Sequence, residues 1–258
     1  MRNVVISLAR TESTNQVARH MALAGKPAGT IIRAEQQSGG KGQRGRSFAS
    51  PPGGLYCSLI LQPDMPLDRL PTVTLAVGLA CRKTLADLYA LAPQIKWPND
   101  LYLDTKKVAG ILCEGLVPEQ RMASGPIVIA GVGINVNSTV TDFPEEIQGL
   151  VTTLYDSLGT RCDLDVLLEE LALAIDEAVA LLQRAPEELL RQWQIHDYLQ
   201  GKELLYTSET VVLEGIGLGV SEQGLYRIRD REGREHAVIG GRLRPRNEVP
   251  DEKETARA

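Results

Sequence analysis

The feature that most constrains the fold is a change in sequence pattern near residue 200. Before it, short apolar runs typical of strands alternate with longer segments whose apolar residues recur every three or four positions. After Gly201 only short β-like runs follow, separated by the turn-like triplets EQG and REG. The sequence therefore predicts an α+β domain over residues 1–199, a small all-β module over 200–247 and a disordered tail over 248–258.

The periodicity also places the individual elements of the first domain. Helices are expected over Thr14–Leu23, 70–91, 165–183 and 187–198. Ser13 or Thr14 should cap the first helix and Asp165 the third, because short polar side chains accept hydrogen bonds from the first backbone N–H groups. Strands are expected in the N-terminal run and over 30–35, Leu55–Leu61, 94–97, 108–117 and 126–136, with Asn99 and Asp100 in a turn after Pro98.

Charge and composition exclude several classes of protein. The 33 acidic and 28 basic side chains give a formal net charge of −5, whereas a nucleic-acid-binding protein needs a basic surface. The four cysteines form no CxxC pair and mostly lie in apolar runs, as expected for core residues in a reducing compartment. No secretion signal or membrane-length apolar stretch is visible, so a cytoplasmic protein without membrane attachment is expected. The three histidines are isolated and assemble neither a zinc site nor a serine triad.

A glycine-rich segment over residues 38–46 carries Lys41, Arg44 and Arg46. Backbone N–H groups and cationic side chains of such a loop can converge on phosphate oxygens. A mobile, solvated basic loop is the alternative, and the segment alone does not separate the two. It matches neither a Walker A sequence nor a GxGxxG loop that opens a helix, so a standard P-loop or Rossmann site is not expected.

The segment KWPND places an aromatic ring, an amide and a carboxylate at Trp97, Asn99 and Asp100. These groups could stack on or hydrogen-bond a purine and position a metal ion on its phosphates. The alternative is a strand end in which Trp97 belongs to the core and Asp100 caps a turn.

Two lysines, Lys106 and Lys107, begin the apolar strand VAGILCEG. Successive strand residues point to opposite faces, so one of the two lysines should face inward. An inward ammonium would stabilise negative charge that develops in a transition state. A solvated pair in a turn is the alternative.

The triplet Ser13, Thr14 and Asn15 is explained by helix capping, although its hydroxyls and amide could equally bind a small polar ring.

Taken in order, TESTN, AEQQSGGKGQRGRSF, KWPNDLYLDTKKVAGILCEG and GVGINVN resemble the motif set of bacterial biotin protein ligases. The likeness covers essentially the whole chain, including GGRL in the β module. It implies an enzyme that activates biotin with ATP as biotinyl-5′-adenylate. The biotin would then pass to a lysine of the biotin carboxyl carrier protein of acetyl-CoA carboxylase. The implied fold is a mixed-sheet catalytic domain of the biotin/lipoate ligase type, similar to class II aminoacyl-tRNA synthetases, followed by an SH3-like barrel.

The resemblance also implies a role for each matching residue. Lys107, with Arg44, would be catalytic. The biotin contacts would be Ser13, Thr14, Asn15, Gln37, Lys41, Gly42, Gln43 and Lys107. The nucleotide contacts would be Arg44, Arg46, Trp97, Asn99, Asp100 and Asn135. Mg²⁺ would arrive with ATP near Asn135, and no metal ion would be held permanently.

The glycine loop departs from the family pattern GRGRxGRxW at three positions. Lys41 and Gln43 stand where arginines are typical, and Phe48 replaces tryptophan. Lysine keeps the charge but lacks the planar fork of arginine, and glutamine keeps only hydrogen bonding. We therefore hypothesise a looser hold on the phosphate of the intermediate.

Two alternatives stay open on the sequence. One is a lipoate or octanoate ligase of the same fold, a family that lacks the GGKGQRGR and KWPND pair. The other is a non-catalytic biotin-binding protein, which is conceivable because Gln43 replaces an arginine. Some relatives carry an N-terminal helix-turn-helix, but here the STN triplet begins at Ser13, so an enzyme that does not bind nucleic acid is expected. The family also implies that two copies can pair through exposed sheet edges as a homodimer.

Overall fold

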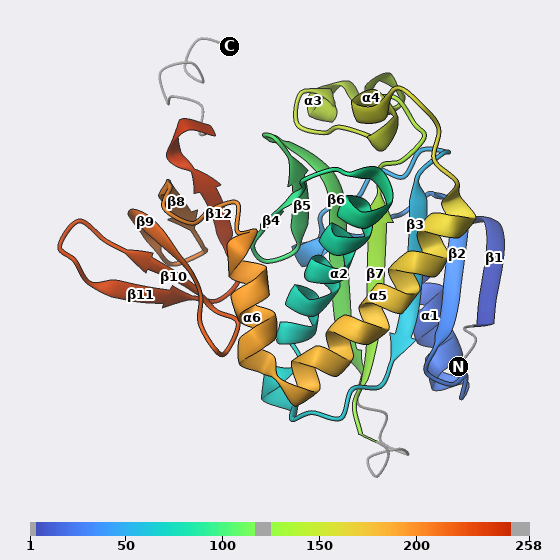
Figure 1. Cartoon of the computed structure of the whole chain (residues 1–258), viewed down its shortest axis with the longest axis horizontal. Helices are drawn as coiled ribbons and strands as arrows, with labels where there is room; N and C mark the ends of the chain where they lie inside the picture. Colours follow the sequence, from blue (N-terminus) through green and yellow to red (C-terminus); the bar gives the residue numbers. More distant parts are fainter. Residues whose placement is uncertain (1–3, 117–124, 249–258) are drawn as a thin grey trace.

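The computed structural model describes residues 4–116 and 125–248, which form a seven-stranded mixed sheet with helices and a separate five-stranded antiparallel sheet (Figure 1). The order in the large sheet is β1-β2-β3-β7-β6-β5-β4. Its strands are β1 (Val4–Thr11), β2 (Thr30–Gln37), β3 (Leu55–Leu61), β4 (Gln94–Lys96), β5 (Asp100–Leu103), β6 (Lys106–Leu116) and β7 (Ile127–Ile134). Only β1 and β2 pair in parallel; the other neighbours are antiparallel.

Helices cover both faces of this sheet (Figure 1). On one face, α1 (Thr14–Leu23) packs on β2, β3 and β7 in a small apolar cluster that includes Ala18 and Ile60. On the other, α2 (Thr72–Tyr89) and α5 (Leu164–Arg184) pack against each other and cover the main core. The central strand β3 is buried along its whole length because both of its faces are covered.

The β module forms the second sheet, with strand order β11-β10-β9-β8-β12. Its strands are β8 (Glu203–Thr207), β9 (Val212–Val220), β10 (Tyr226–Arg229), β11 (Glu235–Val238) and β12 (Arg242–Pro245). Helix α6 (Pro186–Ile195) leads into it and contacts β9. The predicted fold class, an α+β catalytic domain followed by a small β-barrel, is confirmed.

Several local predictions were wrong. Asp163, not Asp165, caps α5, because its carboxylate accepts hydrogen bonds from the backbone nitrogens of Asp165 and Val166 at 2.8 and 3.2 Å. Asp100 does not lie in a turn, because it pairs with Lys96 and Gly110 and so begins β5. Helix α6 ends at Ile195, before Tyr198. Two short helices, α3 (Glu145–Gln148) and α4 (Leu154–Leu158), were not predicted.

Of the tail predicted to be disordered, Glu248 lies within the described residues and ends a 3-10 turn, while 249–258 lie outside them. Within the described ranges, no helix combines the length and apolar character needed to span a bilayer.

Candidate active site

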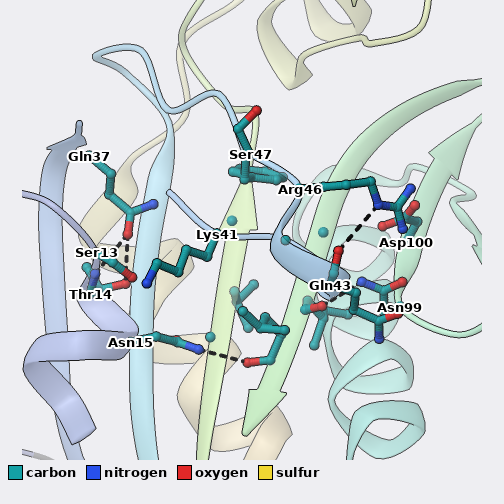
Figure 2. Close-up of a pocket in the computed structure, with 18 of the residues that line it drawn as sticks. Ser13, Thr14, Asn15, Gln37, Lys41, Gln43, Arg46, Ser47, Asn99 and Asp100 are labelled. Carbon is teal, nitrogen blue, oxygen red and sulfur yellow. Dashed lines mark hydrogen bonds between the residues drawn. The ribbon is translucent and has the colours of Figure 1, made fainter. Parts of the chain in front are cut away.

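Two cavities adjoin at the large sheet, and the larger one is also lined by residues of the β module. The smaller cavity, of about 650 Å³, lies between the N-terminus of α1, the segment 41–48 and the backbone of β6 and β7 (Figure 2). The larger, of about 1110 Å³, lies between the segments 96–102 and 143–151 and residues 241–244 of β12 and the turn before it. Both cavities are lined by Arg46, Ser47, Phe48, Asn99, Asp100 and Lys107.

Buried and half-buried polar side chains form one end of the smaller cavity. Gln37 Oε1 accepts hydrogen bonds from Thr14 N at 2.9 Å and from Thr14 Oγ1 at 3.1 Å, and Gln37 Nε2 donates to Ser50 Oγ at 3.0 Å. Asn15 Nδ2 donates to Leu112 O at 3.2 Å and to the Glu114 carboxylate at 2.7 Å. These bonds hold Thr14, Asn15 and Gln37 in fixed orientations, which suits recognition of a small polar ring.

Helix capping does not explain the triplet Ser13, Thr14 and Asn15. Ser13 stands at the N-cap position of α1, is 2% exposed and lines the smaller cavity, yet its side chain makes no capping hydrogen bond. The buried side chain is therefore available to the cavity.

Glycines on β6 and β7 make room for the cavity and its wall. A Cβ at Gly131 would lie 2.1 Å from Asn15 Oδ1, and one at Gly133 would lie 2.4 Å from the Phe48 ring. One at Gly110 would lie 2.9 Å from the same ring. Because any side chain at these positions would displace a wall residue, the space depends on the missing Cβ atoms.

Three cations line the smaller cavity. Lys41 lines the smaller one, and its side chain points toward Ser13 and Thr14 (Figure 2). Lys107 lines both; its Nζ lies 2.6 Å from Asp100 Oδ1 and 5.5 Å from the centroid of the Phe48 ring. Arg46 also lines both. As predicted, one lysine of the pair faces the site, while Lys106 is exposed.

Arg44 does not line either cavity. It adopts a left-handed backbone with φ of 59°, and its guanidinium lies so close to Gly240 that a Cβ there would be 2.3 Å from Nη2. Gly42 and Gln43 do line the smaller cavity. The structure thus brings together most of the predicted residues and leaves Arg44 against the β module.

The KWPND segment contributes to the larger cavity and to the core at once. Trp97 is 5% exposed, packs on Tyr226 of β10 at 5.7 Å between ring centroids and donates from Nε1 to Gly224 O at 3.0 Å. Asn99 Nδ2 donates to Ile111 O at 2.7 Å. Both the core role and the cavity role expected for this segment are therefore present.

Asn135 lies at the inner wall of the larger cavity. Its Nδ2 donates to Thr152 O at 3.0 Å, while its buried Oδ1 makes no hydrogen bond within the described part of the chain. Residues 4–116 and 125–248 contain no group of three His, Cys, Asp or Glu side chains that could hold a metal ion.

Two further parts of the site were not predicted from the sequence. Arg242 and Arg244 of β12 line the larger cavity, although more than 130 residues separate them from KWPND. Glu114 fixes Asn15 from the far end of β6. Arg242 lies in the GGRL segment, but no local pattern indicates its place in the cavity or marks Arg244 and Glu114, because their role depends on contacts made only in the folded chain.

Comparisons with known proteins agree with this geometry. Residues 7–135 match the model of the biotin/lipoate A/B protein ligase family. The bifunctional ligase/repressor BirA of Bacillus subtilis is 31% identical over 86% of this chain and 68% of its own length. The biotin–[acetyl-CoA-carboxylase] ligase of Paracoccus denitrificans is 31% identical over 88% of this chain and 95% of its own.

A solved structure agrees along almost the whole chain. The biotin protein ligase from Aquifex aeolicus in complex with biotin and ATP superposes with a TM-score of 0.83 at 29% identity. The match covers 95% of this chain and 100% of the other. This chain belongs to the biotin/lipoate A/B protein ligase family.

Proposed function

We propose that this protein is a biotin–[acetyl-CoA-carboxylase] ligase, which activates biotin with ATP and transfers it to a lysine of a biotin carboxyl carrier protein. The observation that carries the proposal is the junction of the two cavities. A small polar pocket and a larger cavity with cationic walls meet at Lys107 and Arg46, where a carboxylate and a phosphate could come into contact.

The chemistry requires positive charge at that junction. A carboxylate is a poor electrophile, so its oxygen first attacks the α-phosphate of ATP, and the bond from that phosphorus to pyrophosphate breaks. Negative charge converges in this step, and the ammonium of Lys107 and the guanidinium of Arg46 offset it. In the second step the acceptor amine attacks the acyl carbon and AMP leaves, while the segment 38–46 keeps water from the mixed anhydride.

Each cavity takes one substrate in this proposal. Biotin occupies the smaller cavity, with its polar ring against Ser13, Thr14, Asn15 and Gln37 and its carboxylate toward Lys107. Lys41, Gly42 and Gln43 close over it. ATP occupies the larger cavity, lined by Arg46, Trp97, Asn99, Asp100 and Asn135. Arg44 takes its expected role only when the glycine loop moves away from Gly240.

Mg²⁺ enters with ATP in this scheme. Asn135 Oδ1 is a buried oxygen without a hydrogen-bond donor in the described residues, and such an amide oxygen is a ligand that Mg²⁺ accepts. Asn135 would therefore hold the ion, which supplies charge neutralisation on the phosphates when bound.

We extend the proposal to the domains and surroundings of the enzyme. Residues 1–199 form the catalytic domain, and the barrel at 200–247 closes the nucleotide side through Arg242 and Arg244. The four cysteines are free thiols, which suits the cytoplasm, where we place the enzyme. Pairing of two copies stays a prediction that involves the edge strand β1, where Val4 and Val5 are exposed.

One assay tests the function and its alternatives. The full chain is incubated with ATP, labelled biotin or labelled lipoate, and a biotin carboxyl carrier domain. A carrier with its acceptor lysine changed to arginine is the control. ATP-dependent biotin labelling of the intact carrier alone, with release of pyrophosphate, is the expected result. Lipoate transfer without biotin transfer would identify a lipoate ligase, and biotin binding without transfer would identify a non-catalytic protein.

A further inference from the structure

A buried hydroxyl lies behind the polar end of the smaller cavity. Ser58 is 0% exposed and is not part of the cavity lining. The alternation of β3 directs Ser58 to the face that packs against α1, on the same side as Ile60. Its Oγ lies 2.8 Å from Thr14 Oγ1 and 2.7 Å from Asn15 Oδ1. Ser58 therefore touches two residues that line the cavity without touching its contents.

The orientation of the Asn15 amide decides where the Ser58 proton goes. Asn15 Nδ2 donates to the Leu112 carbonyl and to the Glu114 carboxylate, and both of these groups can only accept. The amide oxygen must then face Ser58. Because Oδ1 cannot donate, Ser58 Oγ is the donor in the 2.7 Å contact with Asn15.

This arrangement in turn fixes the Thr14 hydroxyl. Ser58 Oγ is also the donor in the 2.8 Å contact with Thr14 Oγ1, so its single proton is shared between Asn15 and Thr14, and Thr14 accepts from Ser58. Thr14 Oγ1 in turn donates to Gln37 Oε1 at 3.1 Å. The Thr14 proton therefore stays inside the protein. Thr14 can then offer the cavity only a lone pair, which binds an N–H donor.

We propose that Ser58, supported by the Glu114–Asn15 hydrogen bond, is a positioning residue that makes Thr14 an acceptor for a ring N–H of biotin. The inference rests on the proposed function, since biotin is a cyclic urea with a hydrogen on each ring nitrogen. Without Ser58, the Thr14 hydroxyl loses its short contact and rotates more freely. The cavity would then select a ring N–H less strictly.

Two substitutions at Ser58 separate hydrogen bonding from packing. Ser58→Ala removes the hydroxyl, while Ser58→Cys fills the same place with a thiol, which donates and accepts only weakly. We expect both variants to raise the KM for biotin by roughly tenfold, as for loss of a buried hydrogen-bond partner. The KM for ATP and the turnover at saturating biotin should stay within about twofold of wild type. If packing were the cause, the cysteine variant would behave like wild type.

Ligand analogues give the readout that a merely structural role would not move. In the two isomeric lactam analogues of biotin, one ring N–H is replaced by CH₂. By calorimetry, wild type should bind one of them at least about tenfold more weakly than biotin, because an acceptor is left unpaired. In Ser58→Ala the ratio of the analogue Kd to the biotin Kd should fall by about threefold or more, since the variant weakens biotin binding more than analogue binding.

The outcomes distinguish this inference from the proposed function. A wild-type protein that does not biotinylate the carrier would contradict the proposed function. A wild-type protein that biotinylates the carrier but binds biotin and both analogues equally would overturn the role of Ser58 and Thr14. An unchanged KM for biotin in Ser58→Ala would do the same. Thermal unfolding of each variant checks the fold, and the wild-type analogue measurement decides the matter if neither variant folds.

Discussion

Lys107 lies where the two cavities meet, and its side chain is 28% exposed. The Asp100 carboxylate and the Phe48 ring hold its ammonium in place. Lys107→Ala should lower the rate of adenylate formation about 100-fold or more, because one preorganised positive group is lost from the transition state. Pyrophosphate release measured with biotin and ATP tests this prediction.

Lys106→Ala is the matched control. Lys106 is the neighbour of Lys107 in the chain, and its side chain is exposed and lies outside both cavities. It should release pyrophosphate at the wild-type rate. Thermal unfolding should show that both variants fold. Near-normal turnover of Lys107→Ala would remove Lys107 from the catalytic role.

Gln43 offers a second test at the scale of single residues. It lines the smaller cavity at a position where arginine is typical. Gln43→Arg should slow release of biotinyl-adenylate by about fivefold to tenfold, because a charge-assisted hydrogen bond to the phosphate replaces a neutral one. Stopped-flow measurement of release from the preformed complex tests the hypothesis of a looser hold. Release that is no slower in the variant would count against it.

At the scale of elements, local periodicity predicted what depends on local contacts. The bounds of α1 and β3 were predicted to the residue, because each has a clear pattern and polar or glycine-rich flanks. Asp163 caps α5 in place of the predicted Asp165, and Asp100 lies in β5 and not in the predicted turn. Both differ from the prediction because capping geometry and strand pairing depend on neighbours that sequence spacing does not give. Ser58 carries no signature at all: a serine within LYCSLIL looks like any small buried residue.

Strand β7 shapes the cavities through Gly131 and Gly133, which leave room for the wall residues Asn15 and Phe48. Gly133→Ala would place a Cβ 2.4 Å from the Phe48 ring, so the ring and the loop that carries it must move. Since Phe48 borders both cavities and lies under the Lys107 ammonium, KM should rise severalfold for biotin and for ATP alike. Steady-state kinetics with each substrate varied in turn measures the effect.

Gly149→Ala is a suitable control for that experiment, because a Cβ at Gly149 meets nothing within 4 Å. Its kinetics should match wild type. If Gly133→Ala kept both KM values, Phe48 would not shape the site.

At the scale of the whole molecule, polar contacts join the catalytic domain to Glu248, the residue directly after the barrel. Lys96 Nζ lies 3.2 Å from Tyr102 Oη and 3.5 Å from the Glu248 carboxylate, and Tyr198 donates to the same carboxylate. Burial lowers the pKa of Lys96, while the Glu248 and Asp100 carboxylates oppose that shift. About 150 residues separate Lys96 from Glu248, so no sequence pattern links them. The chain that leaves the barrel is therefore held against Lys96 of KWPND.

Asp197 provides a pH test of the contact between the catalytic domain and the barrel. It follows α6, is 7% exposed, and accepts hydrogen bonds from Tyr226 Oη of the barrel at 2.7 Å and from Leu199 N at 2.9 Å. Burial raises the pKa of Asp197 to about 6, and these hydrogen bonds only partly offset that effect. Between the ordinary pKa of 3.8 and about 6, the folded state binds the proton more tightly than the unfolded state does.

The stability that comes from neutral Asp197 is therefore fully present below pH 3.8 and is lost as pH rises through about 6. Asp197→Asn cannot titrate, so wild type should lose up to about 3 kcal/mol of unfolding free energy relative to this variant between pH 4 and pH 7. Urea unfolding of both proteins across that range measures the difference, and the other carboxylates cancel. Tyr226→Phe should move the window to higher pH, because it removes a donor that favours the carboxylate. If the unfolding free energies of wild type and Asp197→Asn had the same pH dependence, protonation of Asp197 would not contribute to the stability of this contact.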